Sequence, residues 1–169
     1  ITEYMPFKAG GFTLKNELEY FAKAMSNPKR PLVTIFGGSK VSTKMEAIRN
    51  VSKIADRIII GGAMANTFFV AQGLKVGKSL FEPEQVENAA AIAKELKGSK
   101  CELVLPVDVV VAEKLEAGVP TKAVSIEAIG DSEMALDVGP KTVELYASKL
   151  SDAGTIVWNG PVGAFETKE

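Results

Sequence analysis

Short apolar runs alternate along the chain with longer stretches in which apolar residues recur every three or four positions. The apolar runs predict strands at residues 32–36, 57–60, 103–111, 121–126 and 155–158. The periodic stretches predict helices at residues 14–25, 42–55, 64–72, 82–96 and 140–150. Because strands and helices alternate, we expect a three-layer α/β fold, a mostly parallel Rossmann-like sheet with helices on both faces.

The start of the chain lacks such a pattern. Residues 1–12 contain aromatic residues, a proline and a Gly-Gly pair, which indicates an irregular lead-in. Thr13 can cap the first helix, and Ser26-Asn27-Pro28 ends it. Since 169 residues fit a single domain, we expect one α/β domain over residues 13–169, with a leading helix at 13–26.

Composition narrows the classes of chemistry. The net charge of −1 predicts no general affinity for nucleic acid or for an anionic membrane, and no apolar run is long enough to span a bilayer. Cys101 is the single cysteine, so an intramolecular disulfide is excluded, and a buried inert thiol is favoured over a nucleophile. Histidine is absent, which excludes Ser–His and Cys–His nucleophile pairs, histidine metal sites and an imidazole base. Chemistry must therefore use lysine, carboxylate, backbone dipoles or a bound metal ion.

The strand at residues 32–36 leads into a glycine turn with two lysines. Gly37-Gly38 lets the backbone approach a ligand closely, and the N–H groups of a following helix favour an anion. Lys40 and Lys44, four residues apart on the expected first turns of that helix, could reach one phosphate chain. Neither standard phosphate-loop motif is present, so a tight turn with two solvated lysines is an equally good interpretation.

Two further predicted strands also end in glycine turns. Parallel strands place their carboxyl ends at one edge of a sheet, so the three turns should surround one crevice. Gly61-Gly62 could admit a flat base, and Asn159 could donate a hydrogen bond near the crevice, but both segments could simply be turns. Glu166 could accept hydrogen bonds from ribose, or be a solvated carboxylate. Asp108 and Asp137 are candidate magnesium ligands by residue type, although aspartates at strand ends are usually structural. Leu80 and Leu136 could stack on a base, although such leucines are more often core residues.

Five ordered segments together closely resemble phosphoglycerate kinase. They are Phe36–Lys44, Ile60–Met64, Leu105–Asp108, Ala135–Pro140 and Trp158–Glu166. The resemblance covers nearly the whole chain and corresponds to the nucleotide-binding C-terminal domain of that family. It implies reversible phosphoryl transfer between 1,3-bisphosphoglycerate and ADP, with Mg²⁺, in glycolysis.

The resemblance also implies roles for individual residues. Lys40 would be catalytic, steadying the transferring phosphoryl group, and Lys44 would contact the nucleotide phosphates. The remaining residues implied to bind ATP or ADP are Gly38, Gly61, Gly62, Leu80, Ala135, Leu136, Asn159, Pro161 and, for the ribose, Glu166. The sequence departs from the frequent family pattern at Ser39 and Ala63, where alanine and glycine are common, and Ala63 affects how closely a base can approach.

Parts of the family pattern are not found in this sequence. They are the N-terminal domain that holds the triose substrate, the later glycine-rich segment whose aspartate binds the metal–nucleotide, and the closing strands. We therefore expect an excerpt that is incomplete at its C-terminus and inactive alone, from a cytoplasmic enzyme that is a monomer. Two alternatives stay open: a stand-alone anion- or nucleotide-binding module without catalysis, and, less favoured because G-x-G-x-x-G is absent, a nicotinamide-dependent oxidoreductase.

Overall fold

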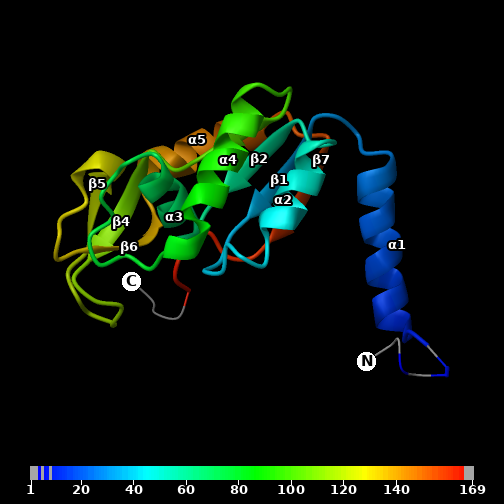
Figure 1. The fold of residues 1–169 in the computed structure, drawn as a ribbon, viewed down its shortest axis with the longest axis horizontal. Coiled ribbons are helices and arrows are strands. Elements are labelled where there is room, and N and C mark those ends of the chain that lie inside the picture. The colour runs from blue at the N-terminus through cyan, green and yellow to red at the C-terminus, as the bar shows by residue number, and fades with distance from the viewer. Residues whose placement is uncertain (1–3, 5, 8, 166–169) are drawn as a thin grey trace.

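A four-stranded parallel sheet and a three-stranded antiparallel sheet form the framework of the fold (Figure 1). The computed structural model describes residues 4, 6, 7 and 9–165. The parallel sheet has the order β3-β2-β1-β7 and the antiparallel sheet the order β5-β4-β6. The strands are β1 (Leu32–Phe36), β2 (Arg57–Ile60), β3 (Glu102–Val104), β4 (Asp108–Ala112), β5 (Lys122–Ser125), β6 (Met134–Val138) and β7 (Thr155–Asn159). The predicted α/β fold with a mostly parallel sheet is thus confirmed.

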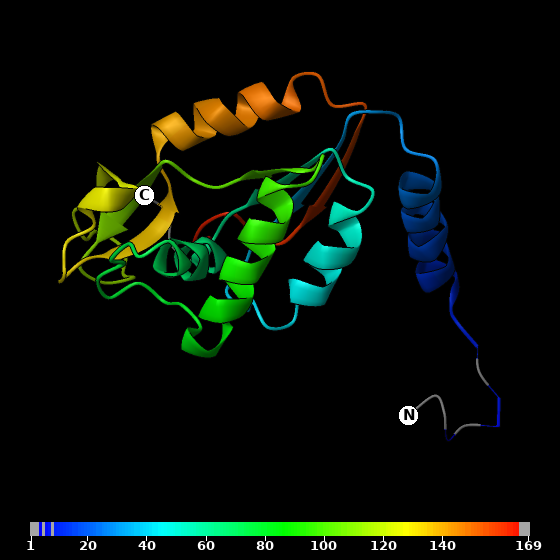
Figure 2. The same ribbon diagram turned by 45° about the horizontal axis from the view of Figure 1, so that its top comes forward.

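Helices cover both faces of the parallel sheet (Figure 2). One face carries α2, α3 and α4, and the other carries α5. The helices are α1 (Phe12–Ser26), α2 (Met45–Ser52), α3 (Ala63–Ala71), α4 (Val86–Lys97) and α5 (Pro140–Leu150), with 3₁₀ turns at Pro83–Gln85 and Ile126–Ala128. Pro140 occupies the first turn of α5, where its missing N–H costs nothing.

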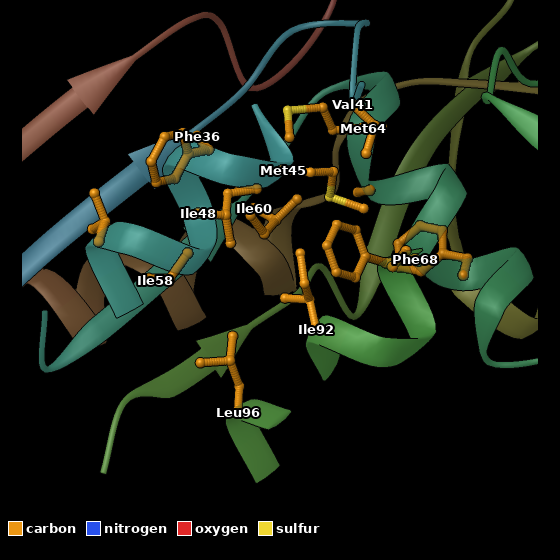
Figure 3. Packing of buried hydrophobic residues seen from close by; sticks show 14 of the residues in the cluster. Phe36, Val41, Met45, Ile48, Ile58, Ile60, Met64, Phe68, Ile92 and Leu96 are labelled. Atoms are coloured by element: carbon orange, nitrogen blue, oxygen red, sulfur yellow. The ribbon is translucent and has the colours of Figure 1, made fainter. Parts of the chain in front are cut away.

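The two cores follow from the alternation of side chains along β1. Leu32 and Phe36 pack with residues of α2, α3 and α4, whereas Val33 and Ile35 pack against the face that holds α5. All of β1 is buried because it lies between β2 and β7 and has helices above and below. This explains its uninterrupted apolar run, as expected for a central parallel strand. Figure 3 shows the larger core, in which Ile48, Phe68 and Ile92 meet over the sheet.

The strands at residues 103–138 differ from those predicted from the sequence. The strand region predicted at 103–111 forms two strands of different sheets and does not continue after Pro106 as a bent extension. β3 pairs parallel with β2, and β4, after Pro106, pairs antiparallel with β5 and β6. Proline lacks a ladder donor, which explains a break at this point. The strand β6 was not predicted, because its half-buried residues form no short continuous apolar run.

Helix α1 stands apart from the sheets in both views (Figures 1 and 2). None of its residues is buried, and the apolar side chains of Leu14, Leu18 and Phe21 are at least half exposed. The helix was correctly predicted from their spacing, but in this structure that stripe stays largely exposed. None of the described helices is both long and apolar enough to cross a bilayer.

Candidate functional site

The carboxyl ends of β1, β2 and β7 are joined by backbone hydrogen bonds. Gly38 N donates to Pro161 O at 2.8 Å, and Gly62 N donates to Val162 O at 2.6 Å. The first turn of α3 reaches back as well, since Met64 N donates to Gly38 O at 3.0 Å. The three glycine turns predicted from sequence therefore do meet, as main chain packed on main chain.

This packing leaves no room for side chains at two glycines. A Cβ at Gly37 would lie 2.0 Å from Pro161 O, and a Cβ at Gly62 would lie 2.8 Å from Gly38 N. Gly62 also has φ +66, in the left-handed region that L side chains rarely adopt. The close approach of the turns thus depends on glycine, which supplies a physical reason for the Gly-Gly pairs in the sequence.

A cavity of about 620 Å³ opens beside these turns, between the two sheets. It is lined by Gly38, Ser39, Gly62, Ala63, Lys78, Leu80, Leu115, Met134, Ala135, Leu136, Pro161, Gly163, Ala164 and Phe165. Six of the residues proposed to bind nucleotide are in that set: Gly38, Gly62, Leu80, Ala135, Leu136 and Pro161. The volume lies in the range that small-molecule sites occupy, and the lining is mostly small or apolar.

Leu80 and Leu136 owe their place at the cavity to specific backbone features. Leu80 is 62% exposed, so the alternative interpretation of Leu80 as a core residue is wrong; its carbonyl accepts a hydrogen bond from Asn66 Nδ2 at 2.9 Å. The pairing of β4 with β6 shifts register between Val110 and Val111, and this leaves Leu136 without a partner in β4. Such a bulge re-aims a side chain, and here the Leu136 carbonyl accepts instead from Ala164 N at 2.7 Å.

The remaining predicted residues lie off this cavity. Gly61 is buried behind it, where a Cβ would meet the Val162 side chain at 2.7 Å. Asn159 and Lys44 instead line a neighbouring groove of about 330 Å³ between α1, α2 and the strands β1 and β7. Lys40 is exposed, and Glu166 lies outside the described residues.

The two lysines precede α2 instead of lying on it. The helix begins at Met45, so the predicted shared helix face of Lys40 and Lys44 is wrong; both belong to the turn. Lys44 Nζ donates to Gly37 O at 2.5 Å and lies 3.5 Å from Asn159 O. Burial lowers the pKa of Lys44 from its ordinary value. Its ammonium group is thus bound to the edge of the glycine turn and is not freely solvated.

Asp108 has a structural role in this fold. Its carboxylate accepts from Lys141 N at 3.1 Å and from Thr142 N at 2.7 Å, which are N–H groups in the first turn of α5. The residue at the N-cap of α5 is Gly139, which has no side chain to do this, and a Cβ there would lie 2.3 Å from the Asp108 carboxylate. Asp108, the first residue of β4 in the antiparallel sheet, therefore caps the N-terminus of α5.

Asp137 was the other magnesium candidate. Its Oδ1 accepts from Val138 N at 2.7 Å, and Gly163 packs so closely that a Cβ there would lie 1.8 Å from the same oxygen. Residues 4, 6, 7 and 9–165 contain no cluster of three or more acidic or cysteine side chains that could hold a metal ion. The described residues therefore do not fit a protein-held magnesium site.

Tyr146 supports the second glycine turn from beneath. Its hydroxyl donates to Ile60 O at 2.7 Å, and burial raises the pKa of this phenol. The β2–β3 pairing ends at Ile59 and Val104, so Tyr146 satisfies the carbonyl that β3 leaves unpaired. The chain can then leave the sheet at Gly61 without an unsatisfied buried acceptor.

Several cavity residues were not identified from the sequence. Lys78, Leu115, Met134, Ala164 and Phe165 line the cavity although none of them was singled out. Met134 would have been found had β6 been predicted, since it begins that strand. The loop residues carry no local signal, because the contacts that place them come from distant segments.

Comparisons with known proteins agree with this architecture. The family profile described as Phosphoglycerate kinase matches residues 1–169. Phosphoglycerate kinase from Desulfosudis oleivorans is 49% identical over 166 residues, which are 98% of this chain and 42% of that protein. The chloroplastic enzyme of Volvox carteri is 47% identical, over 98% of this chain and 36% of its own length.

A solved structure gives the same result. Phosphoglycerate kinase from Coxiella burnetii superposes with a TM-score of 0.88 at 44% identity, covering 92% of this chain and 40% of that one. The chain therefore spans about 40% of the length of the relatives it matches. On both sequence and fold, this chain belongs to the phosphoglycerate kinase family.

Proposed function

We propose that this chain is the nucleotide-binding portion of a phosphoglycerate kinase, which transfers a phosphoryl group reversibly between 1,3-bisphosphoglycerate and ADP in glycolysis. The observation that carries the proposal is the convergence of three glycine turns on one cavity that contains six of the predicted residues. An adenine nucleotide would place its base among Leu80, Ala135 and Leu136. Its phosphates would lie toward Gly38 and the lysines.

Lys44 is suited to binding a phosphate without giving up its present contacts. An ammonium group has three donors, and two of them point to Gly37 O and Asn159 O, which leaves one for a phosphate oxygen. A Cβ built on Gly38 would lie 3.6 Å from Lys44 Nζ, so the ammonium group is next to the cavity edge. The backbone carbonyls hold the charge in place before the ligand arrives, which is the preorganisation that transition-state stabilisation requires.

Lys40 is proposed as the residue that steadies the phosphoryl group in transit. Its exposed side chain on the same turn is free of the carbonyl contacts that hold Lys44, so it can follow a group that moves. Catalysis of phosphoryl transfer requires mainly that the reacting groups are positioned and that the negative charge on the transferring group is stabilised, and a lysine can contribute to both. The described residues do not fit a magnesium site, so in this proposal the lysines supply the positive charge for the phosphates. Binding of the ribose by Glu166 is part of the same proposal.

A stand-alone binding module is the alternative function. The same cavity would then hold a nucleotide or another anion without any phosphoryl acceptor. The two functions differ in their need for a second substrate, so the length of the encoding reading frame separates them. The triose substrate, the monomeric state and the cytoplasmic location belong to the enzyme proposal, and two of the relatives are chloroplastic proteins.

Replacing Lys44 by alanine is expected to weaken ADP binding about 10- to 100-fold, because a charge-assisted hydrogen bond contributes about 1.5–3 kcal/mol. Titration calorimetry of the chain and of Lys44→Ala measures this directly. Lys53→Ala is the matched control, since Lys53 follows α2 and lines neither the cavity nor the groove. Equal affinities for the chain and Lys44→Ala would count against the proposal.

The pH dependence of the same titration gives a second test of Lys44. A lysine whose pKa is lowered loses its charge at a lower pH than an ordinary lysine. Phosphate binds the charged form, so ADP affinity should fall as the pH rises through this lowered value. The Lys44→Ala variant should lack that alkaline loss.

The chain alone is expected to form no ATP above background from ADP, Mg²⁺ and 1,3-bisphosphoglycerate. The physical reason is that transfer requires both substrates held in line, and the described cavity accounts for one of them. A coupled assay for ATP, with the Coxiella burnetii enzyme as the positive control, measures this. Clear turnover by the chain would contradict the proposed division of the substrates.

A further inference from the structure

The loop after α3 contacts the turn that carries the two lysines, here called the lysine turn (residues 38–44). Glu82 Oε2 accepts a hydrogen bond from Ser42 N at 2.7 Å, and Glu82 Oε1 accepts one from the Ser42 hydroxyl at 3.1 Å. Ser42 lies midway between Lys40 and Lys44 in the sequence. One carboxylate therefore holds the middle of the lysine turn through both donors that a serine possesses.

Helix α3 holds Glu82 from the other side. Glu82 N donates to Thr67 Oγ1 at 3.2 Å, and two residues earlier the Leu80 carbonyl accepts from Asn66 Nδ2 at 2.9 Å. Thr67 and Asn66 are both buried, and Glu82 is half-buried. Because α3 begins directly after the second glycine turn, its buried polar side chains fix the loop from Leu80 to Glu82 relative to the cavity.

Two tertiary contacts fix the exposed part of the lysine turn. Val41 is fully buried and packs into the larger core, which anchors the turn at one point. The hydrogen bond from Thr43 Oγ1 to Lys40 O at 3.2 Å is local and gives no link to the rest of the fold. The hydrogen bonds from Ser42 to Glu82 supply a second point, 40 residues away in the sequence. A turn held at one point can still rotate about it, so Glu82 sets the direction of the turn.

We propose that Glu82 is a positioning residue for the nucleotide phosphates, which acts through Ser42 on Lys40 and Lys44; this inference rests on the proposed nucleotide function. A carboxylate has the same sign of charge as the phosphates, so Glu82 does not bind them itself. It keeps the cationic turn in place relative to the loop that carries Leu80 to the adenine side of the cavity. The lysine turn then need not be ordered when ADP binds, which lowers the entropic cost of binding.

The test compares the binding of ADP, with Mg²⁺, and of adenosine, which lacks phosphates, by titration calorimetry, with adenosine measured in competition with ADP. Glu82→Met keeps the length of the side chain and removes both acceptor oxygens. Its affinity for ADP should fall about 3- to 10-fold, because ADP must now order the turn as it binds. Its affinity for adenosine should change by less than about 2-fold, since adenosine has no phosphate for the turn to contact. A general disturbance of the cavity would instead weaken both ligands equally.

Glu82→Gln tests whether position or charge is responsible. Glutamine is as long as glutamate, its carbonyl oxygen can accept from Ser42 N, and its amide can donate to the Ser42 hydroxyl oxygen. Its affinity for ADP should therefore stay within about 2-fold of that of the unchanged chain. Hydrogen exchange gives a readout that needs no ligand: the Ser42 amide should exchange faster in Glu82→Met and at the original rate in Glu82→Gln.

Glu84→Ala is the matched control, because Glu84 is an exposed carboxylate in the same segment and lines neither the cavity nor the groove. It removes the same charge as Glu82→Met, so a long-range effect of charge on the phosphates would appear in both variants. Its affinity for ADP should equal that of the unchanged chain.

Four results would overturn this inference and leave the proposed function standing. They are an unchanged ADP affinity in Glu82→Met, a loss of ADP and adenosine together in that variant, an equal ADP loss in Glu82→Gln, and an equal ADP loss in Glu84→Ala. If the unchanged chain binds no ADP, or binds ADP but no adenosine, the proposed function is overturned, and this inference with it.

Discussion

Replacing Asp108 by alanine is expected to lower the free energy of unfolding by about 3–4 kcal/mol, because several buried polar groups lose their acceptor at once. The carboxylate accepts from Lys141 N, from Thr142 N and from the Thr142 hydroxyl, and Asp108 is only 5% exposed. Water cannot easily replace it at a site this enclosed. Urea denaturation followed by circular dichroism measures the change.

Asp131→Ala is the control for this loss, since the side chain of Asp131 is 89% exposed and its removal should change stability by less than about 0.5 kcal/mol. Equal stability of Asp108→Ala and the unchanged chain would refute the capping role. A more conservative variant, Asp108→Asn, should have a stability between those of Asp108→Ala and the unchanged chain. It keeps the shape and one acceptor oxygen but loses the second.

Acid provides an independent check on the same carboxylate. Burial by itself raises the pKa of Asp108, but the hydrogen bonds from Thr142 and Lys141 outweigh it and hold the pKa below the ordinary value. A lowered pKa stabilises the fold above the pKa of the unfolded chain, and that contribution is lost as the pH falls through the folded-state value. The stability difference between the chain and Asp108→Ala should therefore shrink in acid.

Replacing Gly37 by alanine is expected to cost about 3 kcal/mol or more, toward the upper end of overpacking effects, and to weaken ADP binding as well. The added Cβ would lie 2.0 Å from Pro161 O and 2.9 Å from Gly160 O, so the backbone of one turn must move away from the other. That movement breaks the hydrogen bonds that join β1 to the segment after β7. Thermal unfolding and ADP titration report the two losses separately.

Gly98→Ala is the matched substitution at an open glycine. Gly98 is the C-cap residue of α4 and has φ −97, and the nearest atom to a Cβ built there is Glu95 O at 3.9 Å. Its stability should stay within about 0.5 kcal/mol of the original. If Gly37→Ala proved as stable as Gly98→Ala, the close packing of the turns would not be the constraint described above.

The framework of the parallel sheet was predictable because its signals are local. The run at Leu32–Phe36 is apolar throughout since both faces of that strand are buried, and Pro140 marks the first turn of α5. The antiparallel sheet was less predictable. Its strand β6 is half-buried along its length. Pro106 indicates a break after β3, but no local pattern indicates that the strands on its two sides belong to different sheets.

The candidate site, too, could be predicted from the sequence only in part. The glycine turns were identified because Gly-Gly pairs directly after apolar runs mark places where backbones can approach closely, as they do at Gly37 and Gly62. The start of α2 was placed too early, so the side-chain geometry of Lys44, which contacts two carbonyls, could not be derived. Lys78 was missed because its position depends on Glu133, 55 residues further along the chain.

The segment after β7 connects two sheets that share no strand. Its carbonyl at Pro161 is held by the turn after β1, while its N–H at Ala164 is held by the bulge at Leu136. A molecule seated in the adjoining space would touch both halves simultaneously, so its binding energy is available only while they remain docked. By mass action, such a molecule stabilises the docked arrangement of the two sheets, so that the sheets separate only when the ligand dissociates.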